Sequence, residues 1–139
     1  MSEAIKVEIV SPENLVFSKE ANSITVPGSE GYFTVMGEHA PLMTILKPGF
    51  VTVEQDKEKI SFYVGGGFAD VSPEGVTILA EIAKTSADYS DEEIQSAIIL
   101  AKESLKTADG HEEVGAAQAL LDGFSNFADE VKHMKPSGF

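Results

Sequence analysis

The chain has 139 residues and a formal net charge of -13, and all ten of its basic residues are Lys. This length suits one domain, or one domain with an appendage. The lack of Cys excludes disulfides, thiol catalysis and Cys-ligated metal. The acidic charge and the lack of Arg disfavour nucleic acid and anionic lipid as partners, because both attract a cationic surface. We therefore expect a binding surface that works by shape, apolar contact, and acidic or backbone groups.

Targeting and membrane segments are not visible in the sequence. No apolar run approaches the roughly 20 residues that a membrane-spanning helix needs. The first ten residues, MSEAIKVEIV, have neither a basic region nor an Arg-rich amphipathic pattern. We expect neither a signal peptide nor a transit peptide.

The N-terminal residues predict short strands. Residues 5–9 alternate apolar and charged side chains, which is typical of a half-buried strand. Residues 11–14 predict a turn, and residues 15–17 and 23–26 predict the next two strands, separated by the polar residues 19–22.

The stretch from Val26 to Phe50 alternates turns with short apolar runs. It is rich in Gly and Pro, which favour tight turns, and its runs at residues 33–35 and 42–46 predict strands. Further strands are expected at residues 50–54, 60–64, 68–71 and 76–79, with a charged hairpin tip at residues 55–59. Short strands at this spacing predict an antiparallel all-β sandwich or flattened barrel.

Three consecutive glycines, Gly65 to Gly67, interrupt these strands. A phosphate-binding loop is not indicated, because the GxxxxGK[ST] pattern is missing and no helix follows. We expect a β-bulge or a close strand crossing there.

The hydrophobic period changes to that of a helix near residue 88. Ser90 is the expected N-cap and Glu93 completes a capping box, while Asp109 and Gly110 end the helix. Two apolar stripes follow, made of Ile94, Ala97, Ile98, Ala101, Leu105 and Ala108, and of Val114, Ala117, Leu121, Phe124, Ala128 and Val131. We predict a β-sandwich domain over residues 1–87 and a C-terminal α-helical hairpin over residues 88–139.

Catalytic and metal sites are not indicated. The three histidines, His39, His111 and His133, show no metal-ligand spacing, and no Ser or acid stands in a recognisable motif with His39. The residues alone therefore suggest no catalytic residue, no metal and no cofactor.

Several motifs resemble those of the epsilon subunit of the F-type ATP synthase. They are VPGSEG at 26–31, HAPL at 39–42, LKPG at 46–49, GGFADV at 66–71 and VTILAE at 76–81. The resemblance covers residues 4–83 closely and residues 88–134 in pattern. It implies a non-catalytic central-stalk (rotor) subunit of a proton-translocating ATP synthase, bracing the gamma subunit on the c-ring and coupling ion flow to ATP synthesis. It further implies a peripheral position on the cytoplasmic side of the bacterial inner membrane.

The resemblance also implies contact residues. Those expected to meet gamma are Ser11, His39 and Thr44. Those expected to meet the c-ring are Ser29, Glu30, Gly31 and Tyr32. One departure lies beside His39, where many family members have Pro-Gly and this chain has Gly37 and Glu38.

The hairpin departs further from the family. Some members bind ATP through an Ile/Leu-Asp-x-x-Arg-Ala motif, but here Ser90 and Glu93 occupy its Asp and Arg positions, so we expect no ATP binding. In some members the second helix inhibits ATP hydrolysis through basic residues, whereas residues 109–131 carry six acids and no Lys. In those members the basic residues meet an acidic loop of the beta subunit, which would repel the acidic helix of this chain. We therefore predict that this hairpin inhibits ATP hydrolysis weakly or not at all. Whether the hairpin is folded or extended stays open, as does contact of the hairpin with the alpha and beta subunits.

A different class of function is the alternative. A free β-sandwich module that binds a peptide or a small ligand would be a stable monomer with a concave pocket. An enzyme has the least support, because no catalytic constellation is visible.

Overall fold

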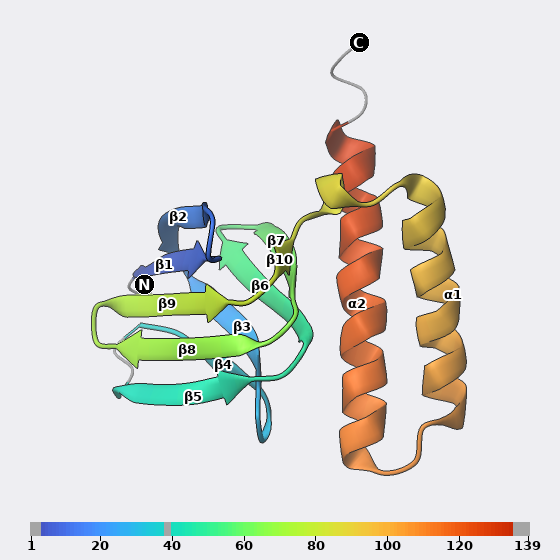
Figure 1. Cartoon of the computed structure of the whole chain (residues 1–139), viewed down its shortest axis with the longest axis horizontal. Helices are drawn as coiled ribbons and strands as arrows, with labels where there is room; N and C mark the ends of the chain where they lie inside the picture. The colour runs from blue at the N-terminus through green and yellow to red at the C-terminus, as the bar shows by residue number, and fades with distance from the viewer. Residues whose placement is uncertain (1–3, 38–39, 135–139) are drawn as a thin grey trace. The chain divides into compact units, whose positions relative to one another are not determined.

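The computed structural model describes residues 4–37 and 40–134, and the chain divides into two compact units, Met1–Ala83 and Lys84–Phe139 (Figure 1). In the described residues there are ten strands, one short 3₁₀ helix and two α-helices. The strands are β1 Ile5–Val10, β2 Leu15–Ala21, β3 Ser23–Gly28, β4 Gly31–Val35, β5 Leu42–Leu46, β6 Gly49–Gln55, β7 Glu58–Val64, β8 Gly67–Ser72, β9 Gly75–Ala80 and β10 Ala83–Lys84. The helices are η1 Ser86–Asp88, α1 Asp91–Thr107 and α2 His111–Met134. The division falls a few residues before the expected boundary after residue 87.

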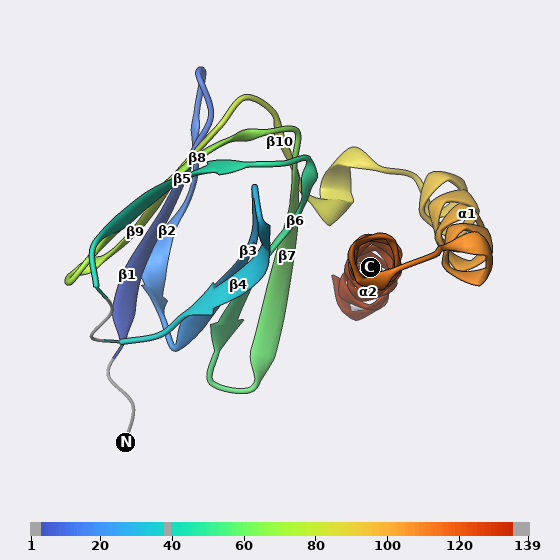
Figure 2. The same cartoon turned by 90° about the horizontal axis from the view of Figure 1, so that it is seen from below.

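The first unit is a β-sandwich with two layers (Figure 2). One layer has the order β5-β8-β9-β1-β2, and the other contains β7, β6 and β3, with β4 paired to β3. Gly28 of β3 pairs with Leu46 of β5 and joins the layers at one edge. The predicted all-β sandwich or flattened barrel is confirmed. One pair departs from the expected antiparallel arrangement, since β1 and β9 run parallel.

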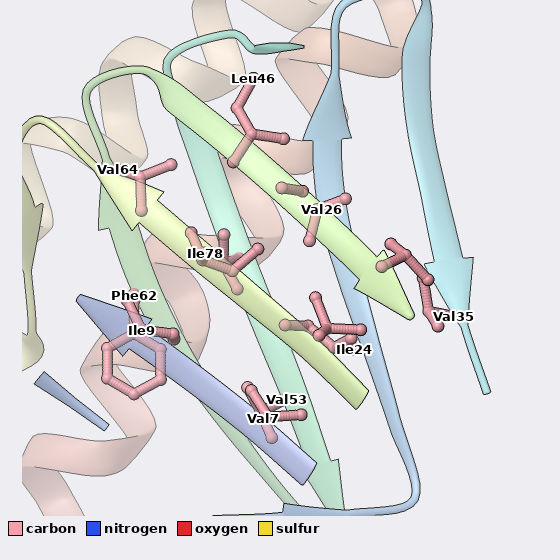
Figure 3. Close-up of a cluster of buried hydrophobic side chains, with 14 of the residues drawn as sticks. Val7, Ile9, Ile24, Val26, Val35, Leu46, Val53, Phe62, Val64 and Ile78 are labelled. Atoms are coloured by element: carbon pink, nitrogen blue, oxygen red, sulfur yellow. The ribbon is translucent and has the colours of Figure 1, made fainter. Parts of the chain in front are cut away.

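Alternating side chains build the core of the sandwich (Figure 3). In β1, Ile5, Val7 and Ile9 are buried while Lys6 is exposed. Side chains from both layers, among them Ile24 and Ile78, point toward one another in the interior. β-Branched residues suit this pleated surface, and each large side chain contributes roughly 1.5–3 kcal/mol by leaving water.

Two expected turn regions are shorter in the structure. β2 continues through residues 19–21, because Lys19 and Glu20 keep their pairing with β1 and Ala21 is buried opposite Ile5. Backbone pairing therefore overrides the polar composition of this segment. The hairpin tip consists of Asp56 and Lys57 alone, since residues 55 and 58 still pair.

The glycine run brings two strands close together. Gly67 has a φ of 141° and pairs with Ala80 of β9. A Cβ on Gly67 would lie 2.0 Å from the carbonyl oxygen of Leu79. Only glycine allows this approach, as expected for a close crossing.

The second unit contains the predicted helical hairpin. The capping box is confirmed: Glu93 N–H donates to Ser90 Oγ at 3.1 Å, and Ser90 N–H donates to Glu93 Oε1 at 2.9 Å. Helix α1 ends at Thr107, slightly earlier than predicted, and Gly110 takes a φ of 89° just before α2.

The helices use a core residue that the predicted stripes omitted. Phe127 is fully buried, and its ring lies 5.6 Å from Tyr89 and 5.9 Å from Phe124, measured between centroids. The predicted stripe ran from Phe124 to Ala128, four residues further along the helix. The buried side chain is that of Phe127, three residues after Phe124, and both spacings place residues on the same helix face. Val114, expected in the seam, is 41% exposed.

Candidate functional site

The predicted gamma-contact residues lie in the β5-β8-β9-β1-β2 layer. Ser11 is half-buried directly after β1, and its N–H donates to the carbonyl oxygen of Asn14 at 2.9 Å. Thr44 is half-buried in β5 and pairs with Ala69 of β8. Because side chains alternate along a strand, Thr44 and the buried Ala69 lie on the inner face of the layer. His39 lies outside the described residues.

The outer face of the same layer carries a row of apolar side chains. The pairs Ile45–Phe68, Phe68–Leu79, Leu79–Val10 and Val10–Leu15 connect five strands in register. Ile45 is 59% exposed, Phe68 49%, Leu79 48% and Leu15 62%. We call these five residues the apolar row. Exposed large apolar side chains that are contiguous across a sheet mark an interaction surface.

The neighbouring row on this face is mostly polar. It contains Met43, Asp70, Thr77, Glu8 and Ser18, again in register across five strands. Met43 is 67% exposed and extends the apolar surface along β5. The surface is therefore an apolar stripe with an acidic and hydroxyl border, which suits a partner whose rim is neutral or basic.

The sequence analysis did not predict the apolar row, because the row takes a single residue from each of five strands that are distant in the sequence. One signal was present: residues 42–46 and 76–80 are apolar on both strand faces. Such runs are typical of strands that are covered on both sides. A polar outer face would have shown strict alternation instead.

The predicted c-ring contacts form the turn between β3 and β4. Ser29 and Glu30 are exposed, and Gly31 has a φ of 127°, a conformation that favours glycine. The pairing of Gly28 with Leu46 brings the base of this turn beside the end of β5 that carries Ile45. The turn and the apolar row are thus neighbours in the fold.

Tyr32 connects this turn with the start of β6. Its hydroxyl accepts a hydrogen bond from the N–H of Phe50 at 3.1 Å. Burial raises the pKa of the Tyr32 hydroxyl above its ordinary value of 10.0, and the bond from Phe50 opposes this rise only in part. The hydroxyl is therefore protonated throughout the neutral pH range.

The hairpin has a shallow hollow of about 460 Å³ near the start of α1. It is lined by Tyr89, Glu92, Glu93, Ser96, Ala97, Leu100 and Phe124. The position expected for a phosphate-binding Arg, Glu93, lies in this lining. Two carboxylates disfavour an anionic ligand here, so the absence of ATP binding stays our prediction.

Residues 4–37 and 40–134 show neither a metal-binding cluster nor a helix able to span a membrane. In this part of the chain, no three His, Asp or Glu side chains are grouped so that they could hold a metal ion. Neither helix, over its described residues, has the length and apolar character that crossing a bilayer requires.

Known proteins share this sequence pattern. Residues 4–86 match the family described as the ATP synthase delta/epsilon chain, beta-sandwich domain. ATP synthase epsilon chains of Brucella anthropi and Brucella canis are each 41% identical over 122 residues, covering 87% of this chain and 90% of the relative.

Solved structures share the fold. A chain of the Euglena gracilis mitochondrial ATP synthase matches with a TM-score of 0.61 and 21% identity, over 92% of this chain and 81% of its own length. A chain from the central stalk and c-ring structure of the Tetrahymena thermophila mitochondrial ATP synthase matches with a TM-score of 0.54 and 14% identity, over 93% of this chain and 97% of its own length. At these identities the likeness establishes the fold.

Proposed function

This chain belongs to the delta/epsilon-chain family of ATP synthase, and on this premise we propose that it is a non-catalytic subunit of the central stalk. In this role it holds the gamma subunit on the c-ring, so that proton flow turns both as one body and drives ATP synthesis. The family match over most of the chain carries this proposal and supports it over the free binding module. We also propose a peripheral position at the cytoplasmic side of a bacterial inner membrane, as the family resemblance implies.

We propose that the apolar row is the surface that gamma covers. Four of its five side chains are about half exposed or more, and burying each would stabilise the complex by on the order of 1 kcal/mol. Ser11 follows Val10 of the row directly in the chain. Thr44 precedes Ile45, but its side chain lies on the inner face of the layer, so it is not part of this outer surface and stays a separate prediction. His39 remains a predicted contact outside the described residues.

We further propose that the β3–β4 turn meets the c-ring. Glu30 at its tip is exposed and offers a carboxylate to basic or amide groups of that partner. Gly31 and Tyr32 complete the contact that the family resemblance implies. Because the turn lies beside the end of β5, the two proposed contact surfaces would adjoin at that strand.

The hairpin is proposed to inhibit ATP hydrolysis weakly or not at all. Its six acidic residues between positions 109 and 131 would be repelled by an acidic loop of the beta subunit. Deleting the residues after Ala87 should leave the ATPase rate of the assembled enzyme nearly unchanged. A several-fold rise of that rate would contradict this part of the proposal.

Calorimetric binding to purified gamma tests the main proposal. The double substitution Ile45→Ser and Phe68→Ser should weaken binding by about tenfold or more, since it removes two neighbouring exposed side chains of the apolar row. Leu100→Ser is the matched control, because Leu100 is 64% exposed but lies on the hairpin. His39→Ala, measured alongside, tests the contact predicted outside the described residues. No binding of the unaltered chain at physiological salt would remove the proposed function.

A further inference from the structure

The start of β6 leaves the hydrogen-bond ladder of its neighbour β3. The two strands pair at Ser23–Glu54, Ile24–Val53 and Thr25–Thr52. Continued in the same register, this ladder would place Pro27 opposite Phe50. That pairing is not formed, because the carbonyl oxygen of Pro27 accepts the N–H of Lys47 at 2.9 Å instead.

A side chain takes the place of the missing backbone partner. Phe50 is a buried residue, and its N–H donates to the Tyr32 hydroxyl. Buried N–H groups almost always have an acceptor, because leaving one without costs much of its desolvation energy. The tyrosine thus supplies the acceptor that β3 no longer offers.

Gly49 makes room for this hydroxyl. A Cβ at position 49 would lie 2.5 Å from Tyr32 Oη and 3.1 Å from the Cβ of Pro27. Real Cβ atoms do not approach an oxygen so closely, so a larger residue would displace the tyrosine ring. The hydrogen bond and the glycine therefore depend on each other.

The two bonds hold the β3–β4 turn from both of its strands. Pro27 and Tyr32 are partners in the β3–β4 register, one pair away from the turn. Pro27 is tied to Lys47 and Tyr32 to Phe50, so both strands are fixed to the segment that joins β5 and β6. The exposed residues Ser29 and Glu30 then stand on a rigid base.

We propose that Tyr32 is a positioning residue whose hydroxyl bond to Phe50 holds the Ser29–Gly31 turn in place for the c-ring. This inference rests on the proposed function. It assigns to Tyr32 an intramolecular role in addition to any contact that its exposed part makes. A rigid turn transmits torque, whereas a loosened one would let the c-ring slip past the subunit.

Hydrogen exchange of the full chain tests the bond itself. Tyr32→Phe keeps the ring and removes the acceptor, so the amides of Phe50 and of residues 29–33 should exchange roughly tenfold faster. Tyr89→Phe makes the same chemical change in the other unit and should leave these amides unaffected. Unchanged exchange in Tyr32→Phe would overturn the proposal.

Gly49→Ala provides an independent test. Alone it should accelerate the same amides, because its Cβ displaces the hydroxyl. In the Tyr32→Phe background it should add little, since the bond is already lost. Fully additive effects would show that the two residues do not act through one hydrogen bond.

The functional readout is the ratio of ATP-driven proton pumping to ATP hydrolysis in the assembled enzyme. In Tyr32→Phe this ratio should fall while the affinity for isolated gamma stays unchanged. An unaltered ratio despite faster exchange would overturn the positioning role and leave the stalk function intact. Failure of the unaltered chain to bind gamma would instead refute the proposed function.

Discussion

The β-sandwich and the helical hairpin bury their apolar side chains in very different ways. In the sandwich, seventeen buried residues among those that the structure describes form one cluster, and nearly all of the large ones are β-branched. In the described part of the hairpin, the buried apolar residues are Ile94, Ala101, Ala117 and Phe127. Two of these four are alanines, which let the helices approach but remove little area from water.

This difference bears on which unit is better suited to carry mechanical load. A core that draws on every layer opens only by global unfolding, whereas a thin helical seam opens locally at lower cost. Both proposed contact surfaces, the apolar row and the β3–β4 turn, lie on the sandwich. A subunit that transmits torque between gamma and the c-ring needs a rigid unit at these contacts. The hairpin carries neither proposed contact surface, so it does not need the same rigidity.

The largest effect should come from the centre of the sandwich. Ile78→Ala removes a fully buried side chain and leaves a cavity, so the free energy of unfolding should fall by about 4 kcal/mol. Chemical denaturation of the full chain measures this. Ile99→Ala is the control, because Ile99 is 57% exposed on α1, and it should change stability by less than about 0.5 kcal/mol. Equal effects would show that the loss at Ile78 does not come from its burial in the core.

The corresponding change in the hairpin should act locally. Phe127→Ala removes a fully buried ring and leaves a cavity, so it should destabilise the hairpin by about 3 kcal/mol, the lower end for a buried Phe. Amides of α1 and α2 should then exchange faster while those of β6 and β9 keep their protection. Loss of protection in both units would show that they unfold together.

The fold was largely predictable from the sequence because local patterns determine it. Alternation placed the strands, and the Ser90 capping box marked the start of α1, since each pattern reports on contacts a few residues away. The predictions were wrong where contacts with residues distant in the sequence determine the local structure. Residues 19–21 continue β2 only because β1 lies alongside, and Phe127 is buried because its ring packs against Tyr89 and Phe124.

The site was less predictable for the same reason. The family resemblance supplied single residues such as Ser11 and Glu30, but the apolar row exists only once five strands are in register. The bond between Tyr32 and Phe50 requires β3 to turn away from β6 after Thr25, which no short pattern encodes.

A smaller effect should come from the start of α1. Ser90→Ala removes one bond of the capping box and weakens the geometry of the other, so the helix should lose about 1 kcal/mol. Exchange of the Glu93 amide, which donates to Ser90, reports this directly. Ser96→Ala, at an exposed position inside the same helix, should be neutral or slightly stabilising. A loss equal to that of Ser90→Ala would point to a general effect of serine removal.

The smallest expected effect is a gain in stability. It tests whether glycine residues lower the stability of the hairpin. Gly115 lies inside α2, and a Cβ there would meet no atom within 4 Å. Gly115→Ala should therefore stabilise the hairpin by roughly 0.5–1 kcal/mol, since alanine restricts the unfolded chain and favours the helix. Gly110→Ala is the contrasting variant: its site is equally open, but the φ of 89° strains any other residue, so it should destabilise. Slower exchange along α2 in the first variant and faster exchange in the second would show that backbone conformation, rather than space, limits this helix. If Gly115→Ala left exchange unchanged, the weakness of the hairpin would lie in its thin seam alone.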